Sequence, residues 1–196
     1  MNIVFLTNSK KDSKPYLDWL VEHDENIKVL ERKLVIEDLD ETKSNFIICH
    51  CYKYIIPEDF LNLLGVWAIN LQYSFLPWNR GEAPLMFNLV EDFPVGVTIH
   101  KIDKGVNTGE ILLQEAISLS PNDTVEVAET KLKNAMFEMF CSNWKYLINR
   151  RVVQIKQTTE GSTYNTSELK KLNLIIDKAG KKITIKKFRE LYGELK

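Results

Sequence analysis

The sequence lacks any apolar run approaching the ~20 residues that a membrane-spanning helix requires. Its first apolar stretch, residues 3–6, is soon followed by Lys10, Lys11, Asp12 and Lys14, an order unlike that of a secretory signal peptide. These two absences predict a cytoplasmic protein that makes no membrane contact.

Cysteine is also scarce. The three cysteines are Cys49, Cys51 and Cys141, an odd number that cannot pair completely. Cys49 and Cys51 lie in an apolar run, where an extended strand would turn both toward the same side, so we expect small buried side chains in a reducing compartment. A metal site would need further ligands, and only His50 lies beside them, so no metal is expected.

Neither sign of charge predominates, because 26 Lys and Arg oppose 27 Asp and Glu. A net charge of −1 creates no overall field that favours nucleic acid, so no nucleic-acid partner is expected. Residues 165–196 are the exception, with nine Lys and Arg against four Asp and Glu. This tail could bind a phosphate-bearing partner, or it could be the solvated face of a short helix that buries Phe188 and Tyr192.

Short apolar runs alternate with amphipathic segments along the chain. Strands are expected at residues 3–6, 27–30, 46–51, 66–71, 96–103, 111–116 and 152–157. Helices are expected from a cap at Ser13, from Pro57 to Gly65, and at 84–90, 123–150 and 186–195. The alternation predicts an α/β fold, a mostly parallel sheet with helices on both faces, whose strand ends bind ligands.

Two runs at predicted strand ends carry the chemistry. Residues 70–81 read Asn-Leu-Gln-Tyr-Ser-Phe-Leu-Pro-Trp-Asn-Arg-Gly, and residues 96–109 read Gly-Val-Thr-Ile-His-Lys-Ile-Asp-Lys-Gly-Val-Asn-Thr-Gly. Together they resemble the signature of the folate-dependent formyltransferases, the family of the methionyl-tRNA, glycinamide-ribonucleotide and sugar N-formyltransferases. The Leu-Pro-Trp-Asn-Arg-Gly run and Gly-Ser-Thr-Tyr at 161–164 look most like the sugar-modifying members.

The resemblance implies one Rossmann-like domain and a division of the chain. We expect residues 1–150 to form the formyltransferase-like domain and residues 151–196 a small C-terminal extension of one strand and one helix. The implied co-substrate is N10-formyltetrahydrofolate, and the implied acceptor is an amino sugar linked to a nucleotide. Because relatives often dimerise, the resemblance also suggests a homodimer.

The two runs depart from the family pattern at two catalytic positions. Where relatives have Asn-x-His and Asp-Thr-Gly, this chain has Gln72 and Asn107. Formyl transfer passes through an oxyanion that needs hydrogen-bond donors, and the amine must lose a proton. The resemblance assigns the donor role to Asn70. Gln72 can donate an N–H but carries no proton near neutral pH, and Asn107 accepts none, so activity should be weakened or abolished.

Three explanations for these amides remain open. The first is an engineered double substitution that traps a complex, and the second is a natural pseudoenzyme or a diverged sequence. The third is relocated chemistry, with His100 or Asp103 as the remaining titratable group. Two other functions also remain open, a folate- or nucleotide-sugar-binding pseudoenzyme and a hydrolase that releases formate from formyltetrahydrofolate.

The remaining site positions are implied by the resemblance. The expected pterin-binding residues are Tyr54, Ile56, Asp103 and Gly105, and for Tyr54 and Ile56 core packing is the alternative. The expected substrate-binding residues are Ser74, Trp78, Arg80, His100 and Tyr164. Alternatively, Arg80 forms a salt bridge that fixes its loop, and His100 is a structural residue bonded to backbone.

Overall fold

The computed structural model describes residues 1–196 except 24, 58–60, 63–64, 82, 165 and 196. Its strands are β1 (Asn2–Leu6), β2 (Asn26–Leu30), β3 (Phe46–His50), β4 (Trp67–Gln72), β5 (Gly96–Lys101) and β6 (Ile111–Ala116). Its helices are α1 (Lys10–Glu22), α2 (Ile36–Thr42), α4 (Pro84–Val90), α5 (Val125–Ile148), α6 (Thr166–Ala179) and α7 (Ile185–Gly193).

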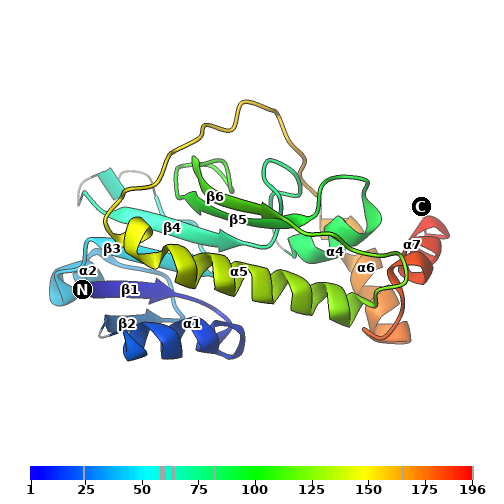
Figure 1. Ribbon diagram of the computed structural model, residues 1–196, viewed down its shortest axis with the longest axis horizontal. Coiled ribbons are helices and arrows are strands. Elements are labelled where there is room, and N and C mark those ends of the chain that lie inside the picture. Colours follow the sequence, from blue (N-terminus) through cyan, green and yellow to red (C-terminus); the bar gives the residue numbers. More distant parts are fainter. Residues whose placement is uncertain (24, 58–60, 63–64, 82, 165, 196) are drawn as a thin grey trace.

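The strands form one sheet in the order β2-β1-β3-β4-β5-β6 (Figure 1). Strands β2, β1, β3 and β4 run parallel, whereas β5 pairs antiparallel with both β4 and β6. The prediction of a mostly parallel α/β sheet is therefore confirmed. The carboxyl ends of the parallel strands meet at one edge, where such sheets bind ligands.

Side chains along β1 alternate between two buried clusters. Ile3 and Phe5 belong to the cluster beneath α1 and α5, whereas Val4 and Leu6 belong to the cluster that contains Leu39 of α2. A strand buried on both faces explains why these runs are continuously apolar. Figure 1 shows α5 running along one face of the sheet, and helices cover both faces as predicted.

Helix α1 begins one turn earlier than expected. Ser9, not Ser13, is its N-cap, and the Ser9 side chain accepts a hydrogen bond from the Asp12 amide. Ser13 is fully buried within the helix. Its hydroxyl lies 2.8 Å from the Thr7 hydroxyl and 2.7 Å from His50 Nδ1, so the prediction of a Ser13 cap was wrong.

His50 lies in a buried polar network at the end of β3. Its Nδ1 contacts Ser13, and its Nε2 lies 2.9 Å from the Tyr73 hydroxyl. Burial lowers the pKa of His50 to about 4, because the interior disfavours the charged ring; the Asp12 charge opposes this and the Lys133 charge adds to it. The folded protein therefore holds this imidazole neutral at pH values where the unfolded chain would protonate it.

This difference makes stability depend on pH. Between pH 7 and pH 5 the unfolded chain binds the His50 proton and the folded protein does not, so the free energy of unfolding should fall by about 2 kcal/mol from this group. Urea denaturation at the two pH values should show a smaller fall in His50→Gln, which carries no titrating ring. His100 is also buried and its pKa is lowered, so it adds to the fall in the free energy of unfolding as the pH decreases.

The matched control is His23→Gln, a change at an exposed histidine. Its loss of stability between pH 7 and pH 5 should exceed that of His50→Gln. An equal loss of stability between pH 7 and pH 5 in wild type and His50→Gln would contradict the assignment.

Several predicted elements differ in the structure. β3 ends at His50, and Cys51 has a φ of 52° and is exposed, so Cys49 and Cys51 do not share a side. The strand expected at 152–157 is reduced to one antiparallel bridge between Ile155 and Ile111. Most of the helix expected from Pro57 to Gly65 lies outside the described residues. Within that span, residues 61–62 are described and are helical.

The C-terminal segment packs as two helices. Phe188 and Tyr192 are buried in a cluster with Phe87 of α4, which confirms the predicted apolar stripe. Just before α7, Thr184 forms a single bridge with Thr124, and helix α6, which was not predicted, precedes it. The division of the chain at residue 150 stays a prediction.

Two absences concern the described residues only. No helix in this part of the chain is long and apolar enough to cross a membrane. Within the same residues, no group of three or more His, Cys, Asp and Glu side chains is arranged to hold a metal ion.

Candidate active site

The site is built where β4 meets β5. Asn70 on β4 lies directly opposite His100 on β5 in the antiparallel register. Gln72 follows Asn70 by two residues and therefore faces the same side of the sheet. The intervening Leu71 belongs to the cluster beneath α5, so the three polar residues lie on the opposite face.

The loop between β5 and β6, residues 102–110, folds back over these strands. Asp103 Oδ1 holds it by accepting hydrogen bonds from Gly105 N at 3.1 Å and from Thr108 Oγ1 at 2.7 Å. A Cβ at Gly105 would lie 2.0 Å from Thr108 Oγ1, and one at Gly109 would lie 1.8 Å from the Lys101 oxygen. Glycine at both positions is what allows the loop to close so tightly.

Closure of this loop brings Asn107 to Asn70. Asn70 Nδ2 lies 3.2 Å from Asn107 Oδ1, 3.3 Å from Gln72 Oε1 and 3.1 Å from His100 Nε2. Asn70, Gln72 and Asn107, predicted from two separate runs, thus share one location. Their catalytic roles stay predictions.

The orientation of the Asn70 amide follows from His100. His100 Nδ1 donates to the Lys101 carbonyl oxygen at 2.8 Å, which leaves Nε2 as the acceptor. Burial lowers the pKa of His100, whose ring is 2% exposed, so it is neutral at pH 7. Asn70 must therefore turn its NH₂ group, rather than its oxygen, toward the ring.

Gln72 is directed differently from what the sequence suggested. Its oxygen faces Asn70, and its Nε2 donates to the Gly81 carbonyl oxygen at 3.3 Å. Its N–H groups are therefore not aimed at the Asn70 cluster. Gln72 is 8% exposed, so using it as a donor to an oxyanion would require its amide to turn.

The predicted pterin-binding positions lie on the same face. Ile56 is 4% exposed and belongs to a cluster against which Ile102, at the start of the loop, is packed. Tyr54 is half-buried, with its ring 5.3 Å from that of Tyr52. Asp103, Gly105 and Ile56 thus belong to neighbouring segments, although Asp103 and Gly105 bond to the loop itself.

Arg80 and Trp78 lie in the turn after β4. Arg80 Nη1 donates to the Glu160 carbonyl oxygen and Nη2 to Gln157 Oε1, both at 2.8 Å, while its buried Nε has no partner among the described residues. Within this part of the chain its partners are neutral oxygens, not the carboxylate of the alternative salt bridge. Trp78 is half-buried and stacks on Phe93 at 4.4 Å.

Two predicted substrate contacts are placed in packing positions. Ser74 is fully buried, and its hydroxyl has no hydrogen-bond partner among the residues that the structure describes. Tyr164 stacks on Phe87 of α4 with ring centroids 3.4 Å apart, and its hydroxyl donates to Asn79. The structure gives Tyr164 a role in fixing the turn after β4, and it does not join the Asn70 cluster.

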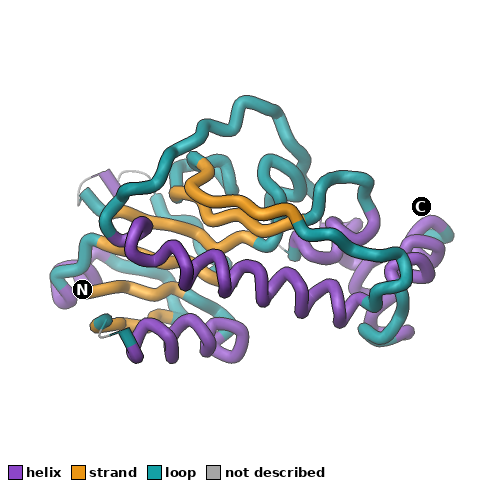
Figure 2. The backbone as a smooth tube through the Cα atoms, viewed as in Figure 1, coloured by secondary structure: helices purple, strands orange, loops and turns teal. Residues whose placement is uncertain are grey.

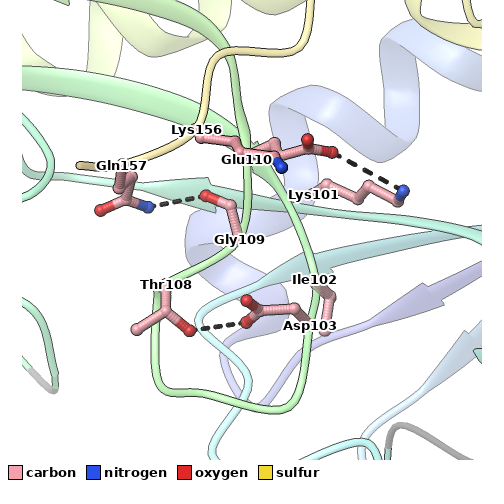
Figure 3. Close-up of a pocket in the computed structure, with 8 residues that line it drawn as sticks. All are labelled: Lys101, Ile102, Asp103, Thr108, Gly109, Glu110, Lys156 and Gln157. Carbon is pink, nitrogen blue, oxygen red and sulfur yellow. Dashed lines mark hydrogen bonds and ion pairs between the residues drawn. The ribbon is translucent and has the colours of Figure 1, made fainter.

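Sequence reasoning did not identify Gln157, which contacts both the loop and Arg80. Gln157 is one of three polar residues in the run Val-Val-Gln-Ile-Lys-Gln at 152–157, a signal too weak to single it out. Gln157 also borders a cavity of about 350 Å³ on the flank of the loop (Figure 3). The cavity is lined by Lys101, Ile102, Asp103, Thr108, Gly109, Glu110, Lys156 and Gln157.

Comparison with known proteins gives three kinds of match. The sequence profile of the family described as formyl transferase matches residues 6–143. Methionyl-tRNA formyltransferase of Caldanaerobacter subterraneus subsp. tengcongensis is 30% identical over 145 residues, which are 70% of this chain and 47% of that protein. The corresponding protein of Rickettsia massiliae is 33% identical over 135 residues, 68% of this chain and 44% of that one. The chain spans about half the length of these curated relatives.

Solved structures match over more of their length. The formyltransferase PseJ from Anoxybacillus kamchatkensis, in complex with UDP-4,6-dideoxy-4-formamido-L-AltNAc and tetrahydrofolate, superposes with a TM-score of 0.84. The match is 30% identical and covers 96% of this chain and 97% of that one. A 4-N formyltransferase from Francisella tularensis shares the fold, with a TM-score of 0.74 at 19% identity over 97% of this chain and 85% of that one.

Proposed function

The chain belongs to the formyl transferase family, and from that premise we propose that it transfers a formyl group from N10-formyltetrahydrofolate to the amine of a nucleotide-linked amino sugar. The proposal rests on the observation that Asn70 Nδ2 lies 3.3 Å from Gln72 Oε1 and 3.2 Å from Asn107 Oδ1. These are the positions at which the family resemblance expects the reacting groups. We further propose that the two amides make turnover slow.

The choice of acceptor rests on the PseJ comparison. That protein was crystallised with a formylated UDP-sugar, and it matches this chain over 97% of its own length. In this chain Arg80 contacts neutral oxygens among the described residues, and its Nε is unpartnered. A guanidinium not neutralised by a described carboxylate suits the diphosphate or hydroxyl groups of a nucleotide sugar.

The co-substrate position rests on the segment around Ile56 and on the loop. The apolar Ile56 and the backbone of a loop that glycine keeps compact suit a flat heteroaromatic ring with polar edges. N10-formyltetrahydrofolate would supply the formyl group from its N10 atom when bound. Ile56, Tyr54 and the loop around Gly105 would hold the ring.

The Asn70 amide would then serve the reaction as a donor. Its nitrogen has two hydrogens but faces three acceptors, on Gln72, His100 and Asn107. To serve a developing oxyanion, one hydrogen would leave an acceptor of the cluster while the other stays bonded within it. Proton removal from the amine is the weak step, because among the described residues the titratable ring at the cluster is His100, whose Nε2 lies 3.1 Å from Asn70.

The test is a product assay with the full chain. It should be incubated with N10-formyltetrahydrofolate and a UDP-linked 4-amino sugar, and the formamide product should be followed by mass spectrometry. We expect slow formylation of the sugar and saturable binding of tetrahydrofolate by calorimetry. A parallel reaction without acceptor measures formate release.

The other outcomes separate the rival functions. Formate release without acceptor would identify a hydrolase, and folate binding without any product would identify a binding protein. Formylation of methionyl-tRNA rather than the sugar would favour the acceptor named by the curated relatives. Absence of folate binding would overturn the proposal as a whole.

A further inference from the structure

Gln157 lies in the long connection between α5 and α6, distant in sequence from the two runs that build the site. Figure 2 shows this connection as a loop that arches back across the molecule. It is fixed to β6 where Ile155 and Ile111 exchange two backbone hydrogen bonds of 2.8 and 2.9 Å. Further along, the Ser162 oxygen accepts from Arg80 N at 2.9 Å. Gln157 is thus held between two anchored points.

The Gln157 side chain joins the loop to the turn after β4. Its Nε2 donates to the backbone carbonyl oxygen of Asn107 at 3.0 Å and to that of Gly109 at 2.7 Å. Its Oε1 accepts from Arg80 Nη2 at 2.8 Å. Figure 3 shows the contact with Gly109. A guanidinium only donates and a carbonyl only accepts, so these partners fix which end of the amide faces which side.

The residue it holds has a backbone that needs support. Asn107 has a φ of 56°, in the left-handed region that asparagine tolerates but does not prefer. Its side chain reaches Asn70 at 3.2 Å, and its own carbonyl is the group that Gln157 binds. Loss of the bond from Gln157 would free the loop backbone at Asn107, and this backbone is what sets the Asn107 side chain against Asn70.

We propose that Gln157 is a positioning residue of the site. It acts through Asn107, holding the loop in the geometry in which Asn107 meets Asn70, and it aligns Arg80 on the same amide. The expected loss of folate affinity rests on the proposed function. The positioning of Asn107 by Gln157 depends only on contacts within this chain.

Glutamate in place of Gln157 is the sharpest test, because it is nearly isosteric and loses only the donors. Gln157→Glu keeps an acceptor for Arg80 but sets an oxygen against the carbonyls of Asn107 and Gly109. Gln157→Ala removes all three contacts. The matched control is Thr158→Ala, a change at the next residue of the connection, which is exposed.

Two measurements should be made on each variant. Hydrogen exchange of the ligand-free protein should become roughly tenfold faster at the amide of Gly105 in Gln157→Glu and Gln157→Ala, since the loop loses two hydrogen bonds to its backbone. Exchange at Ile99 in the middle of β5 should not change. Calorimetry should show tetrahydrofolate affinity lowered by roughly tenfold, with the melting temperature of Gln157→Glu close to that of wild type.

A double-mutant cycle separates positioning from general loosening. Asn107→Gly removes the side chain and suits the positive φ, so in that background Gln157→Glu should weaken folate binding much less than in the wild-type chain. If wild type binds no folate, the proposed function fails, while the exchange measurement still decides the positioning. Unchanged exchange at Gly105 in both Gln157 variants would overturn the inference, as would equal losses of affinity in the two backgrounds.

Discussion

Replacing Gln72 by His together with Asn107 by Asp should raise the rate of formyl transfer by roughly 10²–10⁴-fold, the range that general acid–base catalysis supplies. The structure places both side chains beside Asn70, at 3.3 and 3.2 Å, so the new groups would stand next to the donor. The double variant should show the gain in kcat, measured from initial rates of formamide formation. Tetrahydrofolate affinity should change little, because neither change removes a residue proposed to hold the pterin.

The single variants provide the internal control. Gln72→His alone gains an imidazole without the carboxylate that would orient it, so we expect a smaller gain than in the double variant. His100→Gln in the wild-type background tests the relocated chemistry. If that change abolishes the wild-type rate while the double variant gives no increase, His100 carries the proton transfer. The two amides are then not the reason for slow turnover.

The amides fit the donor and acceptor pattern of the folded site. Gln72 accepts from Asn70 and donates to Gly81, which a neutral amide does with its two ends. Asn107 offers its oxygen to Asn70 and tolerates a φ of 56°. An aspartate at 107 could still accept from Asn70, but a histidine at 72 would have to make different contacts. The double variant should therefore be checked for unchanged melting before its rate is interpreted.

The central sheet could be predicted from the sequence because its signals are local. Continuous apolar runs such as residues 3–6 and 46–50 are what a strand buried on both faces requires. The meeting of Asn70, Gln72 and Asn107 was predicted by resemblance. It depends physically on the pairing of β4 with β5, which sets Asn70 opposite His100, and on a loop short enough to return.

The errors arise where an element depends on a partner distant in sequence. Residues 152–157 have a strand-like composition, but only Ile155 pairs with β6, and Val153 is 77% exposed. Ser13 has the residue type of a cap, but Ser9 supplies the cap, and the Ser13 hydroxyl bonds to His50 across the fold. Tertiary contacts decided each case.

The placement of Tyr164 and Gln157 shows the same limit for the site. Tyr164 ends the Gly-Ser-Thr-Tyr run that was singled out by resemblance, yet its ring packs on Phe87 in the core around α4. Gln157 has no motif, yet its amide joins the loop to Arg80. A residue's distance from the signature does not predict whether the folded connection brings it back to the site.

Asn70→Ala should lower kcat by roughly 10²–10³-fold, because removing one preorganised donor from an oxyanion site costs about 2.7–4 kcal/mol. The effect should be measured in the Gln72→His/Asn107→Asp background, where turnover is expected to be highest and a loss of this size can be followed. The Asn70 amide is the one nitrogen of the cluster that faces His100, Gln72 and Asn107 together. Its removal therefore leaves their acceptor atoms without the shared donor.

Asn143→Ala is the matched control, since the Asn143 amide donates only within α5, to the Met139 oxygen at 2.9 Å. It should leave kcat unchanged in the same background. Tetrahydrofolate affinity should remain within a fewfold of the parent in Asn70→Ala, because a donor used in the transition state contributes to kcat rather than to ground-state binding. A loss of affinity equal to the loss of kcat/KM, with kcat unchanged, would instead make Asn70 a ligand-binding residue, because only a group that holds the transition state more tightly than the ground state affects the chemical step.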